Sequence, residues 1–163
     1  MRTKLKFVLA ALLIVPALFG GELRPFDAKS LSAIRENYSG RPFILAFWSI
    51  HCAPCKEEMA TLAALKKKFP AVPIVLVATD PPSAKAAVTR YLANQKLDRI
   101  ETWAFADEFA EKVRFAVDRK WHGELPRTYF FDAKHESTAH SGVLDSATTE
   151  AWLKKQSAAK SKN

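Results

Sequence analysis

The sequence is short of the residues that build metal centres and disulfide frameworks. Only 2 cysteines and 4 histidines occur among its 163 residues. Cys52 and Cys55 form one C-x₂-C pair, the chain contains no second such pair, and its one H-x₄-H pair, His135 and His140, lies 80 residues after Cys55. A structural zinc site normally draws four ligands from two pairs that lie close together in the chain, so the sequence predicts no metal site. Lys56 follows the pair, which excludes the C-x-x-C-H motif of covalent haem attachment.

The chain also lacks an apolar run long enough for an ordinary membrane-spanning helix. The uncharged apolar run at residues 7–19 has 13 residues and follows the basic stretch MRTKLK. This combination has the length and charge that are typical of a signal peptide. We therefore expect residues 1–21 to be a signal peptide or an N-terminal membrane anchor, and the protein to be periplasmic or otherwise extracytoplasmic.

Two further absences concern the processing of this segment. No small-residue A-x-A cleavage site surrounds ALFGG, so cleavage and retention of residues 7–19 as an inner-membrane anchor both stay open. No cysteine follows the run, which excludes a lipoprotein anchor. We expect contact with the membrane only through this segment.

Clustered arginines are absent as well. The net charge is +8, but Arg2, Lys4 and Lys6 belong to the N-terminal segment, and four lysines lie at or after Lys154. The rest of the chain is mildly basic and has no Arg-rich stripe interleaved with aromatic residues. A nucleic-acid partner is therefore not predicted.

What the sequence does contain is an alternation of strand and helix patterns. The continuous apolar runs at residues 42–48 and 72–79 suit strands that are buried on both faces. Further strand patterns occur at residues 100–106, 127–132 and 137–144, and helical patterns at residues 54–69, 83–96, 107–117 and 146–156. Ser83 and Ser146 are the expected N-caps of two of these helices. This order predicts one α/β domain over residues 23–156 and a disordered basic tail over residues 157–163.

The cysteine pair falls where the first buried strand gives way to a helix, with Pro54 in the first helical turn. A disulfide across so few residues constrains the unfolded chain little, so we interpret the pair as redox-active rather than as a structural staple. Helix N-termini present free N–H groups and a positive dipole end, which stabilise a thiolate at Cys52. An apolar stripe at helical spacing begins at Cys55 and turns that side chain to the core. Cys52 is thus the predicted nucleophile and Cys55 the resolving thiol.

Two neighbours of the pair each allow two interpretations. His51 precedes the nucleophile and either adds positive character or is an exposed loop histidine. Glu58 lies three residues after Cys55, beside the core-facing stripe. A carboxylate held there would have a raised pKa and could exchange a proton with Cys55. Alternatively, Glu58 is favoured by the helix N-terminus and points to water.

The stretch FILAFWSIHCAPCKEEM resembles the TlpA-like thiol-disulfide oxidoreductases, bacterial envelope proteins with a thioredoxin fold and the pattern W-x-x-x-C-x-P-C-x-x-E. The matching residues are Trp48, Cys52, Pro54, Cys55 and Glu58. The stretch LPRTYFFD is similar to the family's cis-proline strand, which implies a cis bond between Leu125 and Pro126 that faces the cysteines. The resemblance implies a single thioredoxin-like domain whose central mixed sheet is flanked by helices.

The chain departs from related patterns on the strand and loop before the cysteines. His51 stands where an aromatic residue is usual in this family, which could shift the redox potential. Ala46 stands where cytoplasmic thioredoxins carry a buried aspartate. This moves the implied proton-handling role to Glu58, as a proton shuttle for Cys55.

The segment before the proline strand is longer than the family pattern. It carries Trp121 and His122, which together with Leu125 are expected to contact partner proteins, because aromatic and charged side chains suit an interface. The alternative is a tolerated surface insertion in which Trp121 packs onto the domain.

By this resemblance the protein is an extracytoplasmic protein disulfide reductase. Its implied partners are disulfide-bearing substrate proteins, in cytochrome c or copper-centre assembly, and a membrane thiol carrier as electron donor. The implied redox centre is the Cys52–Cys55 disulfide, with no other cofactor. The competing interpretations are a disulfide oxidase or isomerase, a copper chaperone of the same fold, and a non-catalytic binding module with an inert disulfide. A peroxidase is not predicted, because a peroxide-reducing cysteine normally acts alone in a different local motif.

Overall fold

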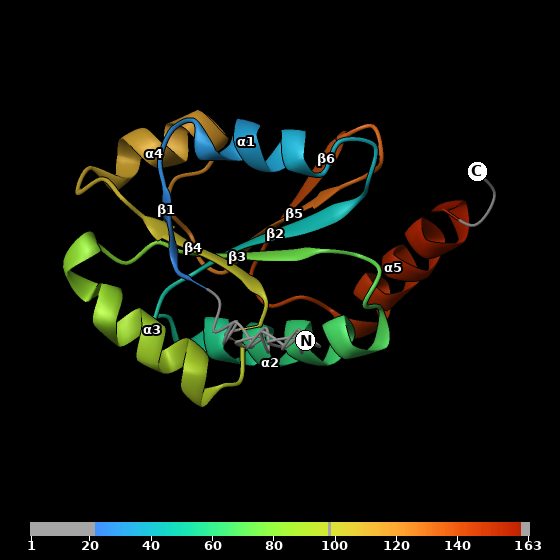
Figure 1. Cartoon of the computed structure of the whole chain (residues 1–163), viewed down its shortest axis with the longest axis horizontal. Helices are drawn as coiled ribbons and strands as arrows, with labels where there is room; N and C mark the ends of the chain where they lie inside the picture. Colours follow the sequence, from blue (N-terminus) through green and yellow to red (C-terminus); the bar gives the residue numbers. More distant parts are fainter. Residues whose placement is uncertain (1–21, 98, 161–163) are drawn as a thin grey trace, which may run out of the picture.

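The computed structural model describes residues 22–97 and 99–160. Its centre is a six-stranded sheet with the strand order β1-β4-β3-β2-β5-β6 (Figure 1). The strands are β1 (Arg24–Phe26), β2 (Phe43–Trp48), β3 (Ile74–Ala78), β4 (Glu101–Phe105), β5 (Arg127–Phe131) and β6 (Ser137–Ser141). The helices are α1 (Ser30–Asn37), α2 (Ala53–Lys68), α3 (Lys85–Asn94), α4 (Ala110–Val117) and α5 (Ser146–Lys160), with a 3₁₀ turn η1 (Pro82–Ala84) before α3.

The expected export segment, residues 1–21, lies outside the described residues. Within the described residues, no helix combines the length and the apolar character needed to cross a membrane. The description of the fold therefore concerns the domain that follows this segment.

The sheet is mixed because parallel and antiparallel pairs meet at β2. The pairs β1–β4, β4–β3 and β3–β2 are parallel, whereas β2–β5 and β5–β6 are antiparallel. β2 and β3 are buried along their whole length, as their continuous apolar runs predict. Side chains alternate along β2, so Ile44 and Trp48 enter one core layer while Phe43 and Phe47 enter the other.

Helices cover both faces of this sheet. α1 and α4 lie on one face, and α2, α3 and α5 lie on the other (Figure 1). The layer under α2 is largely aliphatic, whereas the layer under α1 and α4 holds many aromatic rings, among them Phe26, Phe43 and Phe131. The predicted single α/β domain with a mixed sheet flanked by helices is confirmed.

The sequence patterns did not predict two elements near the start of the chain, and they misplaced the start of a third. No pattern predicted β1 or α1, and β1 has only three residues, too few for an alternation to be recognised. The helix expected to be capped by Ser83 begins at Lys85 instead, and no side chain caps it. Ser83 lies within the 3₁₀ turn that precedes this helix.

The last helix differs from the prediction at both ends. Asp145, rather than Ser146, provides the capping side chain, because its Oδ2 accepts a hydrogen bond from the Thr148 N–H at 2.7 Å. The expected end near Gln156 is also too early. Residues 157–160, which were expected to be disordered, form the last turn of α5.

Candidate active site

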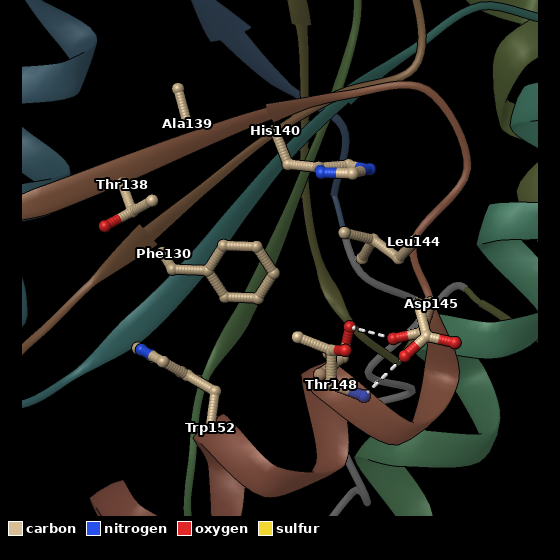
Figure 2. A pocket seen from close by; sticks show the side chains of 9 residues that line it. Phe130, Thr138, Ala139, His140, Leu144, Asp145, Thr148 and Trp152 are labelled. Atoms are coloured by element: carbon tan, nitrogen blue, oxygen red, sulfur yellow. Dashed lines mark hydrogen bonds between the residues drawn. The ribbon is translucent and has the colours of Figure 1, made fainter.

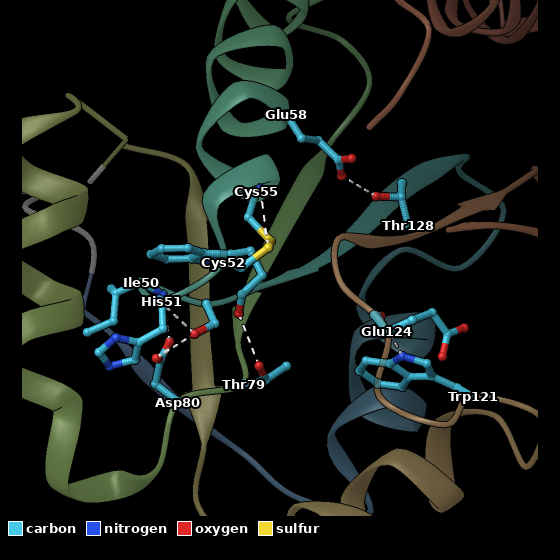
Figure 3. The surroundings of a disulfide bond; sticks show 12 residues. Ile50, His51, Cys52, Cys55, Glu58, Thr79, Asp80, Trp121, Glu124 and Thr128 are labelled. Atoms are coloured by element: carbon cyan, nitrogen blue, oxygen red, sulfur yellow. Dashed lines mark hydrogen bonds between the residues drawn. A yellow bond between two sulfur atoms is a disulfide. The ribbon is translucent and has the colours of Figure 1, made fainter. Parts of the chain in front are cut away.

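The two cysteines lie at the junction of β2 and α2, on the edge of the sheet where the parallel strands end (Figure 3). Cys52 is the N-cap of α2, and Pro54 lies in the first turn, where its missing N–H costs no hydrogen bond. Cys52 and Cys55 form a disulfide bond. The Cys55 N–H donates a hydrogen bond to the Sγ of Cys52 at 3.2 Å, so this sulfur already accepts from the helix N-terminus.

The two cysteines differ in their access to solvent. Cys55 is completely buried in the core layer under α2, whereas Cys52 is partly exposed. The same core layer contains Met59, Leu62 and Leu65, which follow Cys55 at helical spacing. A partner protein can therefore reach Cys52 but not Cys55, as thiol–disulfide exchange with a separate attacking and resolving thiol requires.

Trp48 and His51, just before the cysteines, differ in burial. Trp48 is 2% exposed and packs against the ring of Tyr91 on α3, with the ring centroids 5.1 Å apart. His51 is exposed, and its backbone N–H donates to Ser49 Oγ at 3.1 Å. Of the two interpretations of His51, an exposed loop histidine is the one that its position fits.

Glu58 is buried in the core beneath α2, with 2% of its surface exposed. Thr128 Oγ1 on β5 donates a hydrogen bond to Glu58 Oε1 at 2.6 Å, while Oε2 accepts none from the described residues (Figure 3). Burial raises the pKa of Glu58 above the ordinary glutamate value, although the Thr128 hydroxyl and the nearby His140 act in the opposite direction. The alternative of a glutamate that points to water is therefore excluded.

No hydrogen bond among the described residues joins Glu58 to either sulfur. Figure 3 shows its carboxylate directed toward β5, one helical turn beyond Cys55. The structure thus provides a buried acid, hydrogen-bonded to Thr128, one helical turn from the resolving cysteine. Proton transfer between Glu58 and Cys55 stays a prediction.

The proline strand faces the cysteine end of β2. The peptide bond between Leu125 and Pro126 is cis. β5 starts directly after it and pairs antiparallel with β2, so that Arg127 lies opposite Phe47. Pro126 is buried and its carbonyl accepts from the Gly142 N–H at 2.9 Å, while Leu125 is half-buried between the two core layers.

The expectation that Trp121 contacts partner proteins is wrong. Its side chain is 4% exposed and lies against Phe47, with the ring centroids 4.6 Å apart. Its indole N–H donates to the carbonyl of Glu124 at 3.0 Å, so the polar end of the ring is also satisfied inside the protein. Of the two residues that the sequence proposed in this segment, only His122 is exposed.

Hydrogen bonds of Arg127 on β5 attach residues 118–124 to the sheet. Its guanidinium donates to Asp118 Oδ2 at 2.8 Å, to Glu124 Oε1 at 3.2 Å and to Ser141 Oγ on β6 at 2.6 Å. The phenol of Tyr129 donates to the same Asp118 oxygen at 3.1 Å. Both ends of the long segment are therefore tied to one arginine.

A hollow of about 320 Å³ lies between the β5–β6 pair and α5 (Figure 2). Phe130, His140 and Trp152 are among its lining residues, and Phe130 and Trp152 meet edge to face with centroids 5.1 Å apart. Neither cysteine lines it. The hollow is therefore separate from the redox centre.

Asp80 is a site residue that the sequence analysis missed. It is 3% exposed and accepts hydrogen bonds from the Ser49 hydroxyl and the Ile50 N–H, directly before the cysteines. The signal that could have found it is its place after a buried parallel strand. Side chains that follow the ends of neighbouring parallel strands meet at one edge of the sheet, where α/β proteins place their functional sites.

Comparison with known proteins agrees with this geometry. The AhpC/TSA family matches residues 24–153. Among curated proteins, the thioredoxin-like protein YneN of Bacillus subtilis (strain 168) is 27% identical over 124 residues, which cover 71% of this chain. The chain spans 66% of the length of that relative.

Several solved structures have a similar fold. A secreted Mycobacterium tuberculosis disulfide oxidoreductase, homologous to E. coli DsbE, matches with a TM-score of 0.60 and 20% identity over 74% of this chain and 85% of that one. A thiol:disulfide interchange protein of the thioredoxin family from Chlorobium tepidum TLS matches with a TM-score of 0.62 and 18% identity over 75% and 83% of the two chains. StoA from Bacillus subtilis matches with a TM-score of 0.53 and 19% identity over 70% and 83%. The domain therefore has the thioredoxin fold.

Proposed function

The chain belongs to the AhpC/TSA family, and on that premise we propose that it is an extracytoplasmic thiol–disulfide oxidoreductase that reduces disulfide bonds in partner proteins. The observation that carries the proposal is the asymmetric disulfide at the start of α2. The residue that caps the helix is partly exposed, and its partner three residues later is completely buried. This arrangement separates the thiol that attacks a partner from the thiol that releases it.

The reaction begins with both cysteines reduced. The Cys52 thiolate attacks one sulfur of the partner's disulfide, and the partner's other sulfur leaves as a thiolate. The Cys55 thiolate then attacks the Cys52 sulfur, which forms the Cys52–Cys55 disulfide and releases the second partner thiolate. Two electrons and two protons pass to the partner, and a dithiol donor returns the domain to its reduced form.

We base the reducing direction on the resemblance to the TlpA-like envelope proteins and on the short connection between β3 and β4. Oxidising members of the thioredoxin superfamily carry a large helical insertion, whereas here the connection from β3 to β4 holds only the short turn η1 and the ten-residue helix α3. Partners of the proposed class are disulfide-bearing proteins of cytochrome c or copper-centre assembly. The proposed electron donor is a membrane thiol carrier.

Redox equilibration of the purified protein tests the function. We expect the cysteine pair to exchange with dithiothreitol and glutathione and to have a midpoint potential between about −200 and −270 mV, as in cysteine pairs that reduce disulfides. The reduced fraction is read by alkylation and a mass shift. A midpoint close to about −120 mV would assign an oxidase. A disulfide that does not exchange would assign a binding module.

Export is tested with the reporter enzyme alkaline phosphatase, which is active only outside the bacterial cytoplasm. A fusion to the C-terminus of the chain should be active, because the basic stretch and the apolar run within residues 1–21 are typical of an export signal. The same fusion without residues 2–21 is the control and should be inactive. An inactive full-length fusion of normal abundance would refute the extracytoplasmic location.

A further inference from the structure

Asp80 is brought to the cysteines by the pairing of two parallel strands. β2 and β3 end side by side, with Trp48 opposite Ala78, and the Thr79 N–H continues the ladder to the Trp48 carbonyl at 2.8 Å. The next residue is Asp80, whose carboxylate therefore lies beside the segment that follows β2 (Figure 3). Residues 49–52 form this segment and lead directly into α2.

Two residues, Asp80 and Ser49, accept hydrogen bonds from the backbone N–H groups of residues 50 to 52. The Ile50 N–H donates to Asp80 Oδ2 at 3.2 Å. The His51 N–H donates to Ser49 Oγ at 3.1 Å, and this hydroxyl donates in turn to Asp80 Oδ1 at 2.8 Å. The Cys52 N–H donates to the Ser49 carbonyl at 3.1 Å. The buried Asp80 carboxylate thus holds this segment directly at Ile50 and, through the Ser49 hydroxyl, at His51.

Asp80 is a buried acidic residue without an ionic partner among the described residues. Within residues 22–97 and 99–160, Glu58 and Asp80 are the only buried acidic residues, and no lysine, arginine or histidine forms an ion pair with Asp80. The other charged or titratable side chains of this end are exposed: His51 beside it, Lys56 and Glu57 on α2, and Lys85 and Arg24, which line the same cavity of about 250 Å³ as Asp80. Arg24 forms its ion pair with Glu101. Solvent screens these exposed groups far more than it screens Asp80.

We propose that Asp80 is a positioning residue that holds the approach to Cys52 and, through its negative charge, keeps the Cys52–Cys55 couple reducing. The N-terminus of α2 attracts negative charge and stabilises a thiolate on Cys52. A buried carboxylate at the same end opposes this effect. The opposition raises the free energy of the reduced, thiolate-bearing form relative to the disulfide, so the couple gives up its electrons more readily. This inference concerns the cysteine pair of the proposed function, but it needs no partner protein for its test.

The decisive variant is Asp80→Asn, which keeps the size of the side chain and removes its charge. We expect the equilibrium constant with glutathione to shift about threefold to tenfold toward the dithiol, which corresponds to a midpoint roughly 15 to 30 mV less negative. The pKa of Cys52, measured from the pH dependence of its alkylation rate in the reduced protein, should fall by about half a unit to one unit. A purely structural role would lower the melting temperature and leave both quantities unchanged.

Ser49→Ala tests the hydrogen bonds of this segment separately from the charge of Asp80. It removes the hydroxyl that links Asp80 to the His51 N–H but leaves the carboxylate in place. Amide hydrogen exchange at His51 should become faster in both variants, whereas exchange at Ile50 and the potential should change only in Asp80→Asn. Asp132→Asn is the matched control, since Asp132 accepts from the N–H groups of Lys134 and Glu136 in the β5–β6 turn, beyond the opposite end of β2.

Each outcome bears on one part of the inference. A folded Asp80→Asn protein with an unchanged potential and unchanged Cys52 pKa would overturn the electrostatic part. Unchanged hydrogen exchange at residues 50 and 51 would overturn the positioning part. If Asp80→Asn does not fold, Asp80→Ser removes the charge with a smaller side chain and is judged by the same two quantities. The wild-type potential, measured in the same series, decides the proposed function independently of these variants.

Discussion

Replacing Cys55 with serine is expected to leave the domain folded and to trap partner proteins as mixed disulfides on Cys52. Cys52 is partly exposed at the start of α2 and can still attack, but no second thiol is left to release the partner. Multiple-turnover reduction of a protein disulfide should fall to the uncatalysed rate, because each molecule reacts once and stops. The measurement is a non-reducing gel of bacterial envelope fractions, followed by mass spectrometry of the trapped species.

Cys52→Ser is the matched control for this experiment. It leaves only the completely buried Cys55, which no partner can reach in the folded domain, so neither turnover nor trapping is expected. If Cys52→Ser traps partners and Cys55→Ser does not, the roles of the two cysteines are reversed.

Glu58→Gln is expected to slow the resolving step by about 10²- to 10⁴-fold, the usual contribution of a positioned general base. Cys55 must lose its proton to attack the mixed disulfide, and its complete burial raises the pKa of such a thiol. Glu58 is the buried carboxyl group one helical turn away, and its pKa is also raised by burial, so the two groups can titrate as a coupled pair. Resolution is measured by stopped-flow decay of a preformed mixed disulfide on Cys52.

The exposed neighbour Glu57 supplies the control for that variant. Glu57→Gln changes the same charge on the same helix but at an exposed position, so its resolution rate should match the wild type. The alkylation rate of Cys52 should change little in either variant. Equal resolution rates in Glu58→Gln and the wild type from about pH 6 to pH 9 would remove Glu58 from the mechanism.

The same substitution should make the stability advantage of the variant over the wild type grow as the pH rises, in the reduced protein. Because the pKa of Glu58 is raised in the folded state, folded protein binds more protons than unfolded protein at pH values above the ordinary glutamate pKa. The free energy of unfolding of the wild type therefore falls as the pH rises through the raised folded-state pKa, and Glu58→Gln lacks this loss. Denaturant melts at acidic and mildly alkaline pH should show the difference between the two proteins growing with pH.

The sequence predicted those features of the site that depend on residues close together in the chain. The strand before the cysteines, the helix after them and the burial of Cys55 all follow from periodicity within about four helical turns. Spacing alone left Glu58 open between burial and a position in water, and the resemblance to the TlpA-like proteins favoured the buried, proton-handling role. The hydrogen-bond donor to Glu58, Thr128, could be found only once β5 was known to lie beside β2, because the two residues are 70 positions apart.

Asp80 was missed, and the choice between the two interpretations of Trp121 stayed open, for the same physical reason. The place of Asp80 after a buried strand indicates the edge of the sheet at which it lies, but not that its carboxylate holds Ser49, 31 positions earlier, because that contact requires β2 and β3 to be neighbours. Trp121 follows a charged stretch and looks like a surface residue, but the ring of Phe47 on β2 provides an apolar contact for it. Neither neighbour can be inferred from composition or spacing.

The attachment of residues 118–124 to Arg127 also bears on how partners associate with this edge of the domain. Ordering a flexible loop or side chain at an interface costs about 0.5 to 1.5 kcal/mol for each group immobilised. Here the Arg127 contacts to Asp118 and Glu124 fix both ends of the segment during folding. Its conformational entropy is therefore lost before any encounter, and a partner that contacts His122 meets a preorganised surface. Such a surface binds a matching shape with little further entropic cost and cannot remodel itself to accept a different one.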